Sequence, residues 1–223
     1  MTQTTNHRLG AVALLVAPGL TLAAHLVQVS PTTHDTSSEL ASIAANQARY
    51  EASGWLAFLG AVLMVPALLA MARPLWAARP RLAAIGLSMS IVGLLALVSL
   101  MGSGPVSLAM VRGGDHDQMA ALTDRYESLP LVTAWVLLMI VGYSLGPILL
   151  GVGLWRTGYP WAVPAFLIGG LVLQIADAGR WPLAAGFVLT WAGMALVGVR
   201  LLRRPTHAED RRIASHEQDR AVV

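Results

Sequence analysis

The chain contains no cysteine, no lysine and few charges of either sign. Without cysteine it can hold no disulfide, thiolate nucleophile, thiolate-bound zinc or iron–sulfur cluster. Asp, Glu, Lys and Arg together make up 12% of its 223 residues, about half the share in an average soluble domain. So little charge cannot cover a globule in water, and this excludes a soluble enzyme.

Hydrophobic residues make up 56% of the chain and gather in six uncharged runs. A hydrocarbon core of about 30 Å needs roughly 20 apolar residues per helix. The runs are Leu9 to Val29, Gly54 to Ala72, Leu82 to Met101, Leu131 to Trp155, Trp161 to Ala178 and Pro182 to Val199. The predicted fold class is all-α, a polytopic membrane bundle of six transmembrane helices with two short amphipathic outer helices. Its last two helices form a hairpin, because few residues join them.

The first run has the position of a signal peptide. It is longer than a usual signal core, however, and only Arg8 supplies positive charge before it. Its removal would also leave an odd number of spans. We therefore interpret it as a retained membrane helix.

The arginines are distributed unevenly between the two ends of the predicted helices. Eleven of the fifteen fall on one side: Arg8, Arg73, Arg79, Arg81, Arg156, Arg200, Arg203, Arg204, Arg211, Arg212 and Arg220. The other side has Arg49, Arg112, Arg125 and Arg180, with eight of the twelve acidic residues. Positive charge is retained on the cytoplasmic face, so a multi-pass cell-membrane protein with both termini in the cytoplasm is predicted.

Two amphipathic segments are predicted on the outer side. The first begins with capping-box spacing from Thr36 to Glu39, and an apolar face formed by Leu40, Ile43 and Ala44 follows. Asp115 begins the second, whose apolar stripe consists of Met119, Leu122, Tyr126 and Leu129. Both segments are expected to lie along the outer membrane interface.

The chain is predicted to form one domain. Residues 1–202 form the transmembrane domain, in which the Gly102 to Pro105 segment stops or kinks the third helix. Residues 203–223 mix charges of both signs and are expected to form a disordered, polar cytoplasmic tail.

Few polar side chains enter the predicted spans, where a charge costs about 2.5–3.5 kcal/mol at the bilayer centre. The alternating directions of the helices place those few at one depth, near the outer boundary. The candidate catalytic residues are His25, Glu51 and Asp177. Polar candidates for substrate binding are Gln28, Gln174 and Arg180. These side chains are predicted to converge on one pocket.

Structural roles are the alternative for each of these groups. Asp177 and Arg180 would pair at a helix end, His25 would bond a backbone carbonyl, and Glu51 would be a solvated residue of an amphipathic helix. No metal site is expected at Asp115-His116-Asp117, because adjacent residues at a helix start point in different directions.

Aromatic residues add further candidates for substrate binding. Trp135, Tyr143 and Trp191 lie deep in predicted spans, whereas Trp181 lies at an interface. Aromatic rings inside a bundle can line an apolar ligand pocket or stabilise a cation through their faces. Packing and interfacial anchoring are the alternatives. A GxxxG pair, Gly142 and Gly146, precedes Pro147 and predicts close helix contact with a kink.

The segment from Glu39 to Tyr50, with the apolar helix from Gly60 to Pro66, resembles a widespread group of small, uncharacterised bacterial six-helix integral membrane proteins. The resemblance covers most of the chain in layout but only this segment in residues, and it implies no activity. In size and layout the chain is also similar to small membrane-bound terpene cyclases, which protonate a prenylated substrate with an intramembrane carboxylic acid.

Two functions of different class are consistent with the sequence. The first is metal-independent, proton-initiated cyclisation of an isoprenoid lipid, in which desolvation would raise the pKa of Asp177 or Glu51. It requires no cofactor. The second is that of a non-catalytic accessory subunit or small-molecule permeation protein. Expected partners are membrane lipids and, for the first function, a prenylated or other lipidic small molecule; no basic stripe predicts nucleic-acid binding.

Overall fold

The structure is a computed structural model that describes residues 2–28, 36–113, 116–176 and 180–203. Side-chain placement is also left undescribed for residues 2–7, 116, 117 and 180. The predicted helix start at Asp115, the candidate acid Asp177 and the tail from residue 204 onward therefore lie outside the described residues. So do the side chains of His116, Asp117 and Arg180.

Every regular element in these ranges is helical. In chain order they are α1 (Thr2–Val27), α2 (Thr36–Ala45), α3 (Gln47–Ala78), α4 (Pro80–Met101), α5 (Ser103–Gly113), α6 (His116–Glu127), α7 (Pro130–Leu138), η1 (Met139–Leu145), α8 (Gly146–Trp155), α9 (Ala162–Ile175) and α10 (Arg180–Arg203). The predicted break after Met101 is confirmed, since α4 ends there and α5 begins at Ser103.

Five helical segments of the described chain are long and apolar enough to cross a membrane. They are Arg8–Val27, Gln47–Ala78, Pro80–Gly113, Pro130–Trp155 and Trp181–Arg203. The remaining apolar helix, α9, has 14 residues, so its length of about 21 Å is less than the roughly 30 Å of a hydrocarbon core. The helices thus fit an integral membrane protein, but the predicted count of six spans is not confirmed.

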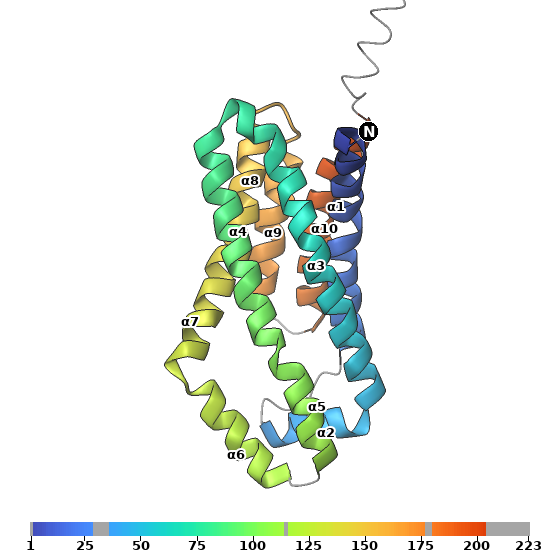
Figure 1. The fold of residues 1–223 in the computed structure, drawn as a ribbon, viewed down its shortest axis with the longest axis vertical. Coiled ribbons are helices and arrows are strands. Elements are labelled where there is room, and N and C mark those ends of the chain that lie inside the picture. The colour runs from blue at the N-terminus through green and yellow to red at the C-terminus, as the bar shows by residue number, and fades with distance from the viewer. Residues whose placement is uncertain (1, 29–35, 114–115, 177–179, 204–223) are drawn as a thin grey trace, which may run out of the picture.

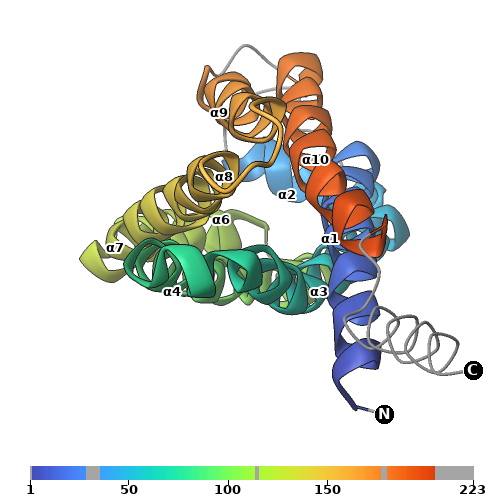
Figure 2. The same cartoon turned by 90° about the horizontal axis from the view of Figure 1, so that it is seen from above.

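The long helices form a closed ring (Figure 2). Around it, α1 packs on α3, α3 on α4, α4 on α8, α8 on α9, α9 on α10 and α10 back on α1. α7 and η1 pack against the side of α4. The first and last membrane helices of the chain are therefore neighbours.

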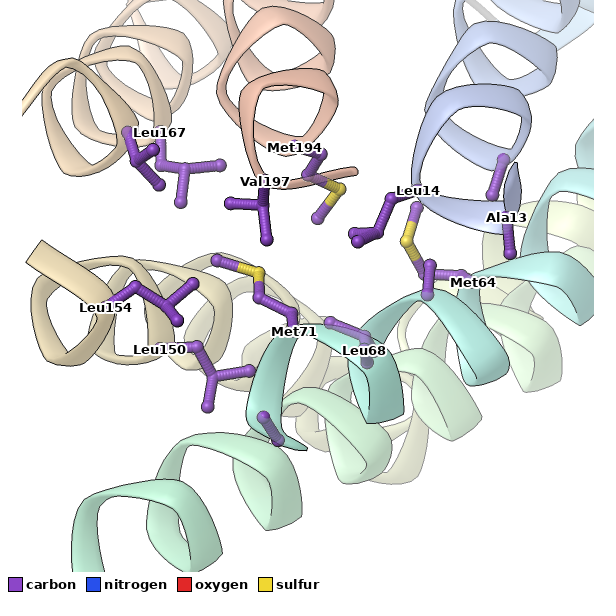
Figure 3. Packing of buried hydrophobic residues seen from close by; sticks show 14 of the residues in the cluster. Ala13, Leu14, Met64, Leu68, Met71, Leu150, Leu154, Leu167, Met194 and Val197 are labelled. Carbon is purple, nitrogen blue, oxygen red and sulfur yellow. The ribbon is translucent and has the colours of Figure 1, made fainter. Parts of the chain in front are cut away.

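Leucine, methionine and valine side chains fill the interior of this ring. Figure 3 shows Leu14, Met64, Leu68, Met71, Leu150, Leu154, Met194 and Val197 converging from α1, α3, α8 and α10. The outer faces are apolar too: Leu9, Val62, Leu95, Leu137, Val172 and Val188 are exposed large hydrophobic residues on six different helices. Helices that are apolar on their exposed faces suit a lipid surrounding.

A three-helix cap of α2, α5 and α6 lies at one end of the ring (Figure 1). Its centre is Leu40 and Ile43 of α2 with Val111 of α5, against which Met119 of α6 packs. The two predicted amphipathic helices are confirmed as helices, but their apolar stripes bury one another in part. The Thr36 hydroxyl donates to Asp124 Oδ1 at 2.7 Å, which ties α2 to α6.

The opposite end of the ring carries arginine. The start of α1, the α3–α4 turn and the ends of α8 and α10 lie together at the top of Figure 1. The arginines at these ends whose side chains are described are Arg8, Arg73, Arg79, Arg81, Arg156, Arg200 and Arg203. The described acidic side chains, Glu39, Glu51, Asp124 and Glu127, all belong to the cap or to the end of α3 beside it.

Candidate functional site

A pocket lies inside the ring between α1, α3, η1, α8, α9 and α10. The empty space among its lining atoms is about 500 Å³, counting the part that opens to the outside, whereas room for the centres of water molecules is only about 30 Å³. Its lining residues are Pro18, Thr21, Met64, Tyr143, Ser144, Pro147, Ile148, Leu167, Leu171, Gln174, Phe187, Thr190 and Met194. Figure 3 shows three of these, Met64, Leu167 and Met194, which are also members of the buried core. The pocket is narrow and mostly apolar.

One polar group of this pocket is built by the α9–α10 hairpin. The Gln174 amide donates from Nε2 to Thr190 Oγ1 at 3.1 Å, and the Thr190 hydroxyl donates to the Gly186 carbonyl at 3.0 Å. These bonds hold the Gln174 side chain across the hairpin and leave its Oε1 atom as an acceptor.

The second polar group comes from η1 on the other side of the pocket. Tyr143 and Ser144 both line the pocket, and neither hydroxyl bonds to a residue that the structure describes. Unlike Thr21, whose hydroxyl donates to the Ala17 carbonyl at 3.2 Å, these two hydroxyls remain free to donate. The pocket therefore presents an amide oxygen and two hydroxyl groups to an otherwise apolar space.

The π-helical form of η1 follows from its neighbours. Pro147 has no N–H, so the carbonyl of Tyr143 lacks the donor that an α-helix would supply. Gly142 and Gly146 lie against the α4 backbone: a Cβ at Gly142 would come within 2.7 Å of the Gly93 nitrogen, and one at Gly146 within 2.6 Å of the Ser90 nitrogen. This close packing confirms the contact predicted for the GxxxG pair. Wide π turns of this kind are frequent at functional sites.

His25 lies next to this pocket rather than in its lining. It is half-buried near the end of α1, its Nε2 atom is buried, and its ring centroid is 5.3 Å from that of Phe187. Phe187 is a lining residue. Gln28 follows the end of α1 and is exposed.

Glu51 lies in the cap-side part of α3 and has a charged partner. Its Oε2 atom is 3.6 Å from Nη2 of Arg112, with the side chains 51% and 57% exposed. Arg112 also donates from Nε to Gln47 Oε1 at 3.3 Å. Glu51 therefore takes part in an exposed link between α3 and α5, and it is absent from the pocket lining.

The tryptophans named as substrate-binding candidates are also absent from the lining. Trp181 is 75% exposed, and Trp135 of α7 is half-buried. The indole N–H of Trp191 donates to the Leu15 carbonyl at 2.7 Å, so this ring joins α10 to α1. Of the candidate residues, the pocket lining contains Tyr143 and Gln174.

The predicted convergence of His25, Glu51 and Asp177 stays a prediction, as does pairing of Asp177 with Arg180. Asp177 and the Arg180 side chain lie outside the described residues. Among the described residues of this part of the chain, Gln174 lines the pocket, and α9 ends at Ile175.

Sequence reasoning missed Thr21, Ser144, Phe187 and Thr190 as lining residues. The sequence did contain a signal for Thr190. Gln174 and Thr190 lie in the two apolar helices of a predicted hairpin, and both side chains can form hydrogen bonds. No comparable signal marks Ser144, because its orientation depends on the π-helical turn.

Comparisons with protein-family models, with curated proteins and with solved structures found no match for this chain.

Proposed function

We propose that the chain is a six-span membrane protein with both termini in the cytoplasm, and that it binds an uncharged lipidic molecule in the pocket of the ring. α9 supports the sixth span because it packs between α8 and α10 in the ring. The arginines at the end opposite the cap support the orientation, since positive charge is retained in the cytoplasm.

The observation that carries this proposal is the pairing of polar groups across an apolar pocket. Gln174 approaches from α9, and Tyr143 and Ser144 approach from η1. Ligand sites are typically apolar pockets with a few convergent polar groups that fix orientation. Two hydroxyl donors and one amide oxygen suit a hydroxyl or carbonyl head, whereas a diphosphate would require cations or a metal.

The lining of the pocket supports a hydrocarbon ligand, because eight of its thirteen residues are apolar: Pro18, Met64, Pro147, Ile148, Leu167, Leu171, Phe187 and Met194. Burial of a hydrocarbon chain against such side chains stabilises a complex by roughly 0.8 kcal/mol per CH₂.

A second candidate function is metal-independent, proton-initiated cyclisation of an isoprenoid lipid. It is favoured by the aromatic residues Tyr143 and Phe187 in the lining, because aromatic faces stabilise cations. Glu51 is an exposed partner of Arg112, so Asp177 is the acid we assign to this reaction.

The binding proposal can be tested with a long-chain alcohol that carries a diazirine in its chain and an alkyne tag. The probe is equilibrated with the protein in lipid nanodiscs and irradiated, and labelled peptides are identified by mass spectrometry. We expect labels on peptides from η1 and α9. Leu171→Trp fills the pocket and should abolish them, whereas Ile168→Trp, on the exposed face of the same helix, should preserve them. Equal labelling of the two variants would refute the proposal.

Cyclisation is tested separately with prenylated aromatics and polyprenyl epoxides. We expect Asp177→Asn to abolish product formation while probe binding persists. No product from the unaltered protein, or full turnover by Asp177→Asn, would remove this second candidate and leave binding standing.

A further inference from the structure

Small residues close most seams of the helix ring. Gly60 lies against Thr21 where α3 meets α1, and Gly198 lies against Ala11 where α10 meets α1. A Cβ at Gly170 of α9 would lie 2.7 Å from the Gly186 carbonyl oxygen of α10. Backbones this close leave no passage between the helices.

The seam between α8 and α9 is closed only in part. A Cβ at Gly151 of α8 would lie 2.7 Å from a methyl carbon of Leu167 and 3.5 Å from Pro164 of α9. This contact belongs to the arginine-bearing half of the two helices.

On the cap side of this contact, η1, which precedes α8 in the chain, and α9 lie apart from each other. η1 packs on α4, α7 and α8, and α9 packs on α8 and α10; across the fully described η1 and α9 no packed interface forms. Tyr143 and Ser144 line the pocket from one side, and Leu171 and Gln174 line it from the other. The pocket thus occupies the place where a helix contact would close this seam.

The exposed side chains of η1 and of the adjoining part of α9 are apolar. They include Val141 and Leu145 of η1, which are 46% and 43% exposed, and Val172 and Ile175 of α9, which are 59% and 61% exposed. We call these four residues the margins of the opening. By contrast, the cap-side end of α3 carries the polar link of Glu51, Gln47 and Arg112. A hydrocarbon chain therefore meets apolar surface at the side of the ring and charge at its end.

From this geometry we infer that the pocket has a lateral entrance between η1 and α9, through which a single-chain lipid with an uncharged oxygen head enters from the surrounding bilayer. The inference rests on the proposed binding function. Gln174 stands on one side of the entrance and Tyr143 on the other, so the head group meets hydrogen-bonding partners as soon as it passes the apolar margin.

The experiment uses the absence of native cysteine. Leu145→Cys with Val172→Cys places one thiol on each margin, and a short, reducible bis-thiosulfonate reagent joins them. The control pair, Gly169→Cys with Leu189→Cys, is joined across α9 and α10, where a Cβ at Gly169 would already lie 3.5 Å from the Leu189 side chain. The same diazirine alcohol is added to nanodiscs for varied times before irradiation.

We expect the η1–α9 cross-link to slow pocket labelling by about tenfold, as a closed gate would, and reduction to restore the rate. The α9–α10 cross-link should leave the rate unchanged. If mass spectrometry verifies the η1–α9 cross-link and the rate of pocket labelling is nevertheless unchanged, the lateral entrance is overturned. The labelling of the pocket would then still support the binding function. Absence of pocket labelling before cross-linking would instead refute the binding function itself.

Discussion

Gly93 has a structural role that its lack of a side chain explains. A Cβ there would overlap the Tyr143 nitrogen and lie 2.5 Å from the Gly142 carbonyl carbon, both backbone atoms of η1. Neither can move aside as the end of a flexible side chain would. The contact fixes the position of Tyr143 at the pocket as well as the separation of α4 and η1.

We therefore expect Gly93→Ala to lower stability by about 1–3 kcal/mol through overpacking. The matched control is Gly54→Ala in α3, where a new Cβ meets nothing within 4 Å. That change should be neutral or stabilising by up to about 1 kcal/mol, because alanine is the better helix former. Thermal unfolding in detergent compares the two, and an equal loss in both would contradict the packing explanation.

Glu51 offers a second contrast at the same scale, because its ion pair is exposed. Glu51→Gln should lower stability by less than about 1 kcal/mol and leave labelling of the pocket unchanged. Unfolding and diazirine labelling measured on one preparation check both statements. Loss of pocket labelling in a Glu51→Gln protein of normal stability would show that Glu51 takes part in ligand binding.

The cap is the element in which pH dependence is expected. Partial burial raises the pKa of Glu39, and the negative charge of Glu127 raises it further. A raised carboxyl pKa means that the folded cap binds the proton more tightly than the unfolded chain. Its contribution to stability is complete below the ordinary pKa near 4.5 and is lost as the pH rises through the raised value.

The protection factors of the α2 and α6 amides, which correct each exchange rate for its intrinsic pH dependence, should consequently be higher in mild acid than at neutral pH. Glu39→Gln should remove much of this difference, because glutamine does not titrate. The backbone amides of α1, which lie outside the cap, provide the internal control. A pH dependence of α2 unchanged by the substitution would assign the effect to another group.

At the scale of elements, the sequence predicts where helices lie better than how they meet. Apolar run length identifies α1, α3, α4 and α10, and Gly102 marks the α4–α5 break. The expectation that α2 lies along the membrane interface describes only part of its surroundings. Leu40 and Ile43 also pack against Val111 of α5, a helix distant in sequence. Periodicity shows that a face is apolar but not whether lipid or protein covers it.

The candidate site could be predicted only in part for the same reason. Tyr143 was identifiable as an aromatic residue deep in a predicted span, and Gln174 as one of the few polar side chains in an apolar run. The separation of η1 from α9, which creates the pocket, depends on Pro147 and on glycines that pack against α4. The sequence predicts the same apolar runs whether or not this π-helical turn forms.

For the whole molecule, α9 decides the count of spans. If α9 crosses the bilayer, the α8–α9 and α9–α10 connections face opposite sides. Single cysteines from Pro160→Cys, at an exposed position of the α8–α9 connection, and Gly179→Cys should then react with an impermeant maleimide on opposite sides of sealed vesicles, with Pro160→Cys on the cytoplasmic side. Reaction of both from one side would give α9 a re-entrant path and leave five spans.

The adjacency of α1 and α10 has a consequence for how the protein is made. The ring closes where α1 meets α10, which follows every other helix of the ring in sequence, and α10 also contributes Phe187, Thr190 and Met194 to the pocket. During insertion, the face of α1 that packs on α10 stays uncovered until the ribosome has delivered α10. The pocket is therefore the last part of the ring to assemble, and a product that ends before α10 inserts without acquiring it.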